Sequence, residues 1–153
     1  MAKGAIPPDR RPPEEQRGRN LSEDRVSARP QIQELHHASL LVADTERSLR
    51  FYRGVLGLEL IAERPDLGYP GAWLRVGRAQ IHLLELPNPD PVEGRPAHGG
   101  RDRHLALTVV DLAPLIACLE AARLSFTLSR SGRRALFCRD PDGNALELIE
   151  AAD

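Results

Sequence analysis

The apolar positions in the first half of the chain predict a strand, a helix and three further strands, in that order. Residues 35–42 predict a strand. Asp44 can cap a helix in which Leu49, Tyr52 and Leu56 recur at helical spacing until Gly57 ends it. Three further strands are predicted at residues 58–63, 72–76 and 80–86.

The second half of the chain shows the same order of patterns. Residues 104–109 predict a strand, and Asp111 can cap a helix with one apolar stripe over residues 112–122. Three short strands follow at 126–129, 135–139 and 145–150, and the sequence DPDGN makes a tight turn between the last two. The halves are therefore two tandem βαβββ modules, and the predicted fold class is α+β.

The register of the two halves supports this duplication. The segments HASLLVAD from His37 and HLALTVVD from His104 both place a histidine seven residues before the aspartate that caps the helix. Further along, His82 and Glu147 each lie near the middle of the last strand of their module. Four polar side chains thus occupy two pairs of equivalent positions.

Two segments rich in proline divide the chain. Residues 1–30 hold five prolines and twelve charged residues, which predicts a disordered tail over residues 1–32. Residues 87–102 hold four prolines and three glycines, which predicts a linker. We expect one folded domain over residues 33–153, with its first module at 33–86 and its second at 103–151.

Strand alternation places the four polar side chains on one kind of face. His37, His82, His104 and Glu147 each lie on the face opposite the alternating apolar residues of their strand, which pack beneath the helix. A single histidine in a strand is usually a packed or edge residue, and water or mutual hydrogen bonds can satisfy it. Four such groups at related positions favour a divalent metal such as zinc, nickel, iron or manganese, and His37, His104 and Glu147 form the two-histidine, one-carboxylate set of non-haem iron.

Composition excludes several other classes of protein. The formal net charge is −1, which provides no field for nucleic acid or an anionic membrane. Lys3 is the only lysine, and neither GxxxxGK[ST], GxGxxG nor GxSxG occurs, so phosphate-loop, dinucleotide-binding and esterase chemistry are not expected. Cys118 and Cys138 lack metal spacing and are predicted to be buried free thiols. No apolar run suits a membrane span or a signal sequence, so a cytoplasmic protein is expected.

These residues carry a family resemblance. The stretches LHHASLLVADTERSLRFYRGVLGLEL, RHLALTVVDL and CRDPDGNALELIE resemble the vicinal oxygen chelate superfamily, which includes glyoxalase I, extradiol dioxygenases and the bleomycin and fosfomycin resistance proteins. The resemblance implies a cupped mixed β-sheet with helices outside, a homodimer, and metal ligands at His37, His82, His104 and Glu147. Two features differ from the family pattern: His82 stands where glyoxalase I usually has a carboxylate, and Arg123 follows the second helix where glycine is usual.

The resemblance implies a metal-dependent lyase or isomerase whose small substrate chelates the metal through adjacent oxygens. Glu147 is the first candidate for the base and His82 the second. The alternatives are an extradiol-type or other iron-dependent dioxygenase, and a metal-free protein that sequesters a ligand.

Strand alternation also predicts which side chains contact the substrate. Trp73 and Arg75 are expected to line the pocket beside His82, with Phe137 as an apolar wall. Arg75 could bind an anionic group, although a surface role is as plausible. Apart from Arg75 and Arg139, no cluster of cations is expected near the site.

Overall fold

The computed structural model describes residues 31–152. It divides the chain into Met1–Gln33 and Glu34–Asp153, and the second part contains every helix and strand described below. The disordered tail predicted for residues 1–32 falls almost wholly outside the described residues. Within residues 31–152, no helix has the length and apolar character needed to cross a bilayer.

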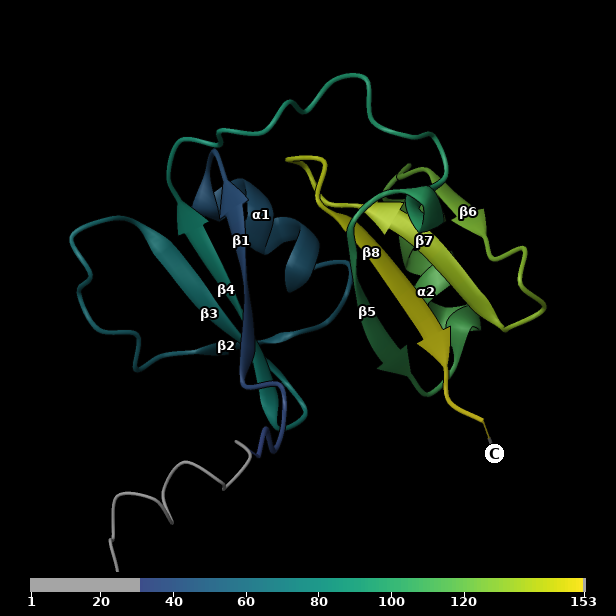
Figure 1. Cartoon of the computed structure of the whole chain (residues 1–153), viewed down its shortest axis with the longest axis horizontal. Helices are drawn as coiled ribbons and strands as arrows, with labels where there is room; N and C mark the ends of the chain where they lie inside the picture. The colour runs from purple at the N-terminus through teal and green to yellow at the C-terminus, as the bar shows by residue number, and fades with distance from the viewer. Residues whose placement is uncertain (1–30, 153) are drawn as a thin grey trace, which may run out of the picture. The chain divides into compact units, whose positions relative to one another are not determined.

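The first module forms one four-stranded mixed sheet with one helix (Figure 1). Strand β1 pairs in parallel with β4, whereas β4 with β3 and β3 with β2 are antiparallel, in the order β1-β4-β3-β2. The elements are β1 (His37–Val42), α1 (Thr45–Tyr52), β2 (Glu59–Ile61), β3 (Gly71–Val76) and β4 (Ala79–Glu85).

The second module repeats this topology as a separate sheet of order β5-β8-β7-β6, drawn in green and yellow in Figure 1. The parallel pair is again formed by the first and last strands of the module. The elements are β5 (His104–Val109), α2 (Leu112–Ala121), β6 (Phe126–Leu128), β7 (Ala135–Arg139) and β8 (Ala145–Glu150). The predicted duplication and the α+β class are confirmed.

Both helices begin as the sequence predicts and also receive a second cap. The side chains of Asp44 and Asp111 accept hydrogen bonds from the first turns of α1 and α2. In addition, Glu85 at the end of β4 accepts from the backbone N–H of Thr45, and Glu150 at the end of β8 accepts from that of Leu112. The last strand of each module therefore secures the start of its own helix.

The end of α1 differs from the prediction. α1 ends at Tyr52 instead of continuing to Gly57, because the chain then makes wider turns in which Leu56 donates to the carbonyl of Phe51 and Leu58 to that of Tyr52. At the end of α2, Arg123 and Leu124 donate to the carbonyls of Glu120 and Leu119 in a Schellman motif. Arg123 has φ of 55°, the left-handed conformation that usually requires glycine.

The predicted division of each strand into two faces is confirmed. Ile81 and Leu83 of β4 and Leu146 and Leu148 of β8 are buried in the hydrophobic core. The polar positions of β1 and β5 lie on the opposite, open faces. Of the two thiols, Cys138 is buried and free as predicted, but the prediction for Cys118 is wrong: it is exposed, because it lies off the buried stripe of α2.

The linker contains a short 3-10 helix, Gly99–Arg101, that packs on the second sheet. A Cβ atom at Gly99 would lie 2.9 Å from the Cβ atom of Phe137, so only glycine allows this close approach. Asp102 binds Arg95 at 2.9 Å and Arg139 at 2.8 Å. These contacts hold the end of the linker beside β7.

The β7–β8 turn connects the second module to the first. The hydroxyl of buried Tyr52 in α1 donates to Oδ2 of buried Asp140 at 2.8 Å. Asp142 of the same turn pairs with Arg47 and accepts from the backbone N–H of Ala43. Asn144 donates to the carbonyl of Leu41. The DPDGN sequence therefore forms the predicted turn and also joins the modules.

Candidate functional site

The second module brings His104 and Glu147 together. Glu147 lies in the middle of β8, and its Oε2 is 3.2 Å from Nε2 of His104 on the neighbouring edge strand β5. Phe137 is the direct cross-strand neighbour of Glu147 on β7, and its ring meets that of His104 edge to face at 5.3 Å. The predicted apolar wall is thus in contact with this pair.

The backbone determines which nitrogen of His104 carries the proton. Nδ1 lies 2.8 Å from the carbonyl oxygen of Asp102, and a carbonyl only accepts, so Nδ1 is the donor. In the neutral ring, Nε2 then presents a lone pair to the carboxylate of Glu147. Two acceptors 3.2 Å apart repel each other unless a proton or a cation lies between them. A histidine that donates through its second nitrogen to a carbonyl is also the usual arrangement of a metal ligand.

Glu147 is a buried carboxylate with an unused oxygen. Its side chain is 6% exposed, and Oε1 has no hydrogen-bond partner among the described residues. The nearest guanidinium, that of Arg133, is 3.9 Å away, beyond hydrogen-bond distance. An unpaired buried carboxylate oxygen costs free energy, so a ligand, an ion or water is needed to complete its surroundings.

The first module brings His37 and His82 together in a stack of rings. The ring of His82 lies parallel to that of His37, with centroids 4.1 Å apart, and on its other side parallel to that of Trp73 at 4.4 Å. Nε2 of His82 lies 2.7 Å from Oε1 of Gln80 and donates to it, which leaves Nδ1 of His82 with a lone pair. Trp73 therefore contacts the histidine that it was predicted to accompany.

The surroundings of His82 favour its neutral form by lowering its pKa. Burial lowers the pKa of His82, and the charges of His37, His36 and Arg64 lower it further. A neutral imidazole can bind a metal or accept a proton. The His82 environment is compatible with both roles given to it by the sequence.

The four predicted ligands form two pairs rather than one cluster. Over residues 31–152, no group of three or more histidine, cysteine, aspartate or glutamate side chains is placed to hold one metal ion. His37 and His82 stand together on the first sheet, and His104 and Glu147 stand together on the second. Strand alternation correctly predicted the sheet face on which each of the four side chains lies. Within one chain, however, the two pairs do not meet at a common point.

The arginines around the site differ from the expectation. Arg75 shares the face of His82 but lies 3.5 Å from Glu59 in an exposed ion pair. Arg139 is occupied by Asp102 and two carbonyls of the linker and turn. The expectation of no further cations is wrong, because Arg101, Arg130 and Arg133 line a cavity of about 310 Å³ with His104 and Glu147. They were missed because they belong to connecting segments, where no periodicity predicts the direction of a side chain.

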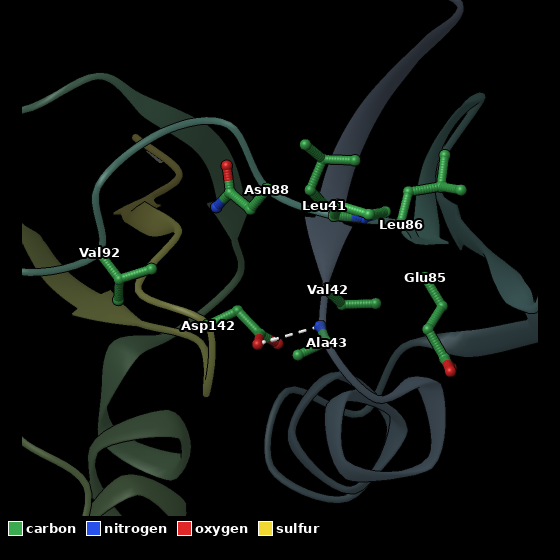
Figure 2. Close-up of a pocket in the computed structure, with 9 residues that line it drawn as sticks. Leu41, Val42, Ala43, Glu85, Leu86, Asn88, Val92 and Asp142 are labelled. Carbon is green, nitrogen blue, oxygen red and sulfur yellow. Dashed lines mark hydrogen bonds between the residues drawn. The ribbon is translucent and has the colours of Figure 1, made fainter.

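A different cavity, of about 410 Å³, lies where β1 and β4 end and the linker begins (Figure 2). Leu41, Leu86 and Val92 make part of its wall apolar, and Asp142 lies 3.1 Å from the backbone nitrogen of Ala43 at its edge. Within residues 31–152, neither a histidine nor an arginine lines this cavity. The candidate chemistry therefore lies on the open sheet faces and not in this cavity.

Known proteins resemble this chain over the same residues. A family model described as the Glyoxalase/Bleomycin resistance protein/Dioxygenase superfamily matches residues 34–148. The lactoylglutathione lyase of Salmonella typhimurium is 33% identical over 129 residues, which cover 78% of this chain and 93% of that enzyme. The protein Glyoxylase I 4 of Arabidopsis thaliana is 29% identical over 119 residues, which cover 74% of this chain and 68% of that protein.

Solved structures show the same fold. The fosfomycin resistance protein FosX of Mesorhizobium loti superposes with a TM-score of 0.61 at 20% identity, over 80% of this chain and 94% of that chain. A glyoxalase/bleomycin resistance protein/dioxygenase of Alicyclobacillus acidocaldarius gives a TM-score of 0.58 at 20% identity, over 78% and 92%. At this identity the likeness concerns architecture alone.

Proposed function

Because the chain belongs to the Glyoxalase/Bleomycin resistance protein/Dioxygenase superfamily, we propose that it is a metal-dependent lyase or isomerase. Its substrate is a small molecule that binds the metal through two adjacent oxygens. The name of the Salmonella relative, a lactoylglutathione lyase, supports the class of reaction. The observation that carries the proposal is the pair of His104 and Glu147, in which Nε2 of His104 lies 3.2 Å from Oε2 of Glu147 and Oε1 of Glu147 lacks a partner among the described residues.

The residues present fit a divalent transition metal. His37, His82 and His104 offer imidazole nitrogens and Glu147 a carboxylate oxygen, a donor set that suits zinc, nickel, iron or manganese. A cation beside Nε2 of His104 would remove the repulsion between that nitrogen and Oε2 of Glu147. Oε1 of Glu147 would stay free to face the substrate.

We propose that two copies of the chain complete the site. Each chain carries both pairs but keeps them apart, and a two-fold axis can bring the first module of one copy to the second module of the other. Such a dimer contains two equivalent sites. The proposed homodimer is therefore part of the catalytic arrangement.

His82 needs a change of orientation if it is to be a ligand. The rings of His37 and His82 are parallel, with centroids 4.1 Å apart. The lone pair of each ring lies in the plane of that ring, so the two lone pairs cannot point to the same ion. One ring must turn out of the stack before both histidines can bind one metal ion. In the observed orientation His82 can accept a proton at Nδ1, because Nε2 is held by Gln80. His82 can therefore act as a base in the observed orientation, and as a metal ligand only after its ring has rotated.

The roles of the remaining residues follow from their positions. A bound divalent ion supplies positive charge where charge develops on the substrate oxygens. Glu147 would take the substrate proton at Oε1, the oxygen that has no other partner. Phe137 beside His104 and Trp73 beside His82 would exclude water from the substrate, and Arg75 would contact an anionic part of it.

Metal analysis tests the proposal directly. Protein purified without added metal is expected to contain zinc, nickel or another divalent metal, and His104→Ala and Glu147→Ala are expected to lose it. Equal metal content in all three proteins would refute the site. Ferrous iron with oxygen consumption would instead indicate a dioxygenase, and full ligand affinity after chelation would indicate a metal-free binding protein.

Mixing two inactive variants tests the shared site. The double variant His37→Ala/His82→Ala keeps the pair His104 and Glu147 of the second module. The double variant His104→Ala/Glu147→Ala keeps the pair His37 and His82 of the first module. After subunit exchange, mixed dimers would each contain one intact site, so metal binding should return to about a quarter of the wild-type level. If mixing restores no metal binding although the wild-type protein binds metal, both pairs must act within one chain.

A further inference from the structure

Three arginines line the cavity that holds His104 and Glu147. Arg101 comes from the 3-10 helix of the linker, whereas Arg130 and Arg133 come from the loop between β6 and β7, about thirty residues later. We call these three residues the arginine wall. Among the residues that the structure describes, Glu147 is the only acidic one in the lining, so their charges give the cavity an excess of positive charge.

Among the described residues, two members of the arginine wall lack the carboxylate partners that neutralise arginines at a neighbouring cavity, whereas the third, Arg133, forms an ion pair with Glu147. At the cavity of about 350 Å³ beside β1 and β5, Arg95 is paired with Asp102 and Arg103 with Asp90. By contrast, over residues 31–152 the side chains of Arg101 and Arg130 form neither an ion pair nor a hydrogen bond. Arg133 is 3.9 Å from Glu147, too far for a hydrogen bond.

The loop that carries two of these arginines is held by its own hydrogen bonds. Ser129 donates its backbone N–H to the carbonyl of Ala135 at 2.8 Å, and its hydroxyl is 2.9 Å from that of Ser131. Nε of Arg133 donates to the Ser131 hydroxyl at 3.3 Å. Because the serines line the same cavity, the loop presents hydroxyl groups beside the guanidinium groups.

The ring nitrogens of both histidines of this cavity contact other groups of the protein. His98 accepts from the backbone N–H of Gly100 at Nδ1, and its Nε2 is 3.3 Å from the carbonyl of Leu128. Both of its nitrogens are therefore used in the neutral ring. His104 is directed to Asp102 and Glu147. The guanidinium groups are the remaining donors for an anion.

We propose that the arginine wall binds a doubly charged phosphate or phosphonate group of the substrate, next to the reacting atoms at His104 and Glu147. Several guanidinium groups and two hydroxyls match a tetrahedral group with three oxygens better than a planar carboxylate with two. As a statement about the substrate, this inference rests on the proposed function. The anion site itself needs no metal, so the two can fail separately.

The test uses the full-length protein freed of metal with a chelator. Methylphosphonate, inorganic phosphate and acetate are titrated into it by calorimetry, at a pH where the phosphonate is doubly ionised. The wild-type protein is expected to bind methylphosphonate and phosphate, and to bind acetate at least about tenfold more weakly. Equal binding of acetate would overturn the assignment to a tetrahedral dianion.

Matched variants locate the binding. Arg101→Ala/Arg130→Ala is expected to weaken methylphosphonate binding at least about tenfold. Arg50→Ala, which removes an exposed arginine of α1 away from this cavity, should leave it unchanged. Thermal unfolding confirms that each variant is folded, and the single variant Arg130→Gln provides a milder change. Unchanged binding in the double variant would overturn the proposal.

Metal content in the same variants separates the two claims. Loss of phosphonate binding with normal metal content supports the anion site beside an intact metal site. If the wild-type protein holds no metal but its phosphonate binding still depends on Arg101 and Arg130, the proposed reaction fails and the anion site stands. If metal is bound and the arginines have no effect, only the anion site is refuted.

Discussion

Replacing Tyr52 by phenylalanine should destabilise the protein without disturbing the core. The ring stays in place, but Asp140 loses the hydroxyl that donates to its Oδ2 at 2.8 Å, and both residues are buried. Asp140 keeps Asn144 as a donor to the same oxygen. A buried hydrogen bond to a charged group contributes about 1.5–3 kcal/mol, so Tyr52→Phe should lower the free energy of unfolding by about that amount.

The effect should depend on pH. Burial raises the pKa of Asp140. The hydrogen bonds from Asn144 and Tyr52 lower it, but the effect of burial is larger, so the net shift is upward. Asp140 therefore contributes stability that is fully present below its unfolded pKa and is lost as pH rises through the folded pKa. Without the Tyr52 hydroxyl the folded pKa rises further, so the difference between variant and wild type is largest at neutral pH and shrinks on acidification.

Urea unfolding of both proteins, followed by circular dichroism at neutral and acidic pH, measures this difference. Effects of other titrating groups cancel because the same groups are present in both proteins. In an Asp140→Asn background, the Tyr52→Phe substitution should cost only about 0.5–1.5 kcal/mol, the value for a neutral hydrogen bond. A loss that is the same at every pH and in both backgrounds would refute the assigned charge interaction.

Three further outcomes follow from the fold. Arg123→Gly should raise the free energy of unfolding by about 0.5–1 kcal/mol because φ is 55° there, whereas Arg123→Ala should not; urea unfolding distinguishes them. Glu85→Ala should cost about 1 kcal/mol, since Thr45 would lose its acceptor at the start of α1, and a matching loss of thermal stability would show it. Burial, together with the charge of Asp140, raises the pKa of Cys138 to about 12. A thiol reagent at about pH 8 should therefore modify only the exposed Cys118 in the native protein. Mass spectrometry measures the labelling, and early modification of both cysteines would contradict this.

Local pattern predicted most of the fold. The bounds of β5, β7 and β8 match the prediction, because the DPDGN turn separates β7 from β8 and Asp111 caps α2 two residues after the end of β5. The end of α1 was missed because Leu56 continues the helical spacing although the backbone has already left the helix. A Cβ atom at Gly54 would lie 2.3 Å from the carbonyl oxygen of Arg50, a contact that no periodicity reveals.

The sequence predicted on which face of each sheet the candidate site residues lie. Alternation put Trp73 on the pocket face of the strand beside His82 and made Phe137 an apolar wall in the second module. The structure adds that Trp73 pairs directly with His82, and Phe137 with Glu147. Alternation cannot predict how two separate sheets are arranged, so it did not show that the four candidate ligands form two pairs. The arginine wall lies in connecting segments, where side-chain direction depends on contacts distant in sequence.

The contact between Tyr52 and Asp140 makes the two halves of the chain unequal. The position of α2 that corresponds to Tyr52 is Leu119, which is fully buried and has no hydroxyl. A chain built from two copies of the second module would therefore bury a carboxylate opposite leucine, and a chain built from two copies of the first would lack the DPDGN acceptor. The two modules share one topology, but each supplies a different partner of this contact, so neither module can replace the other.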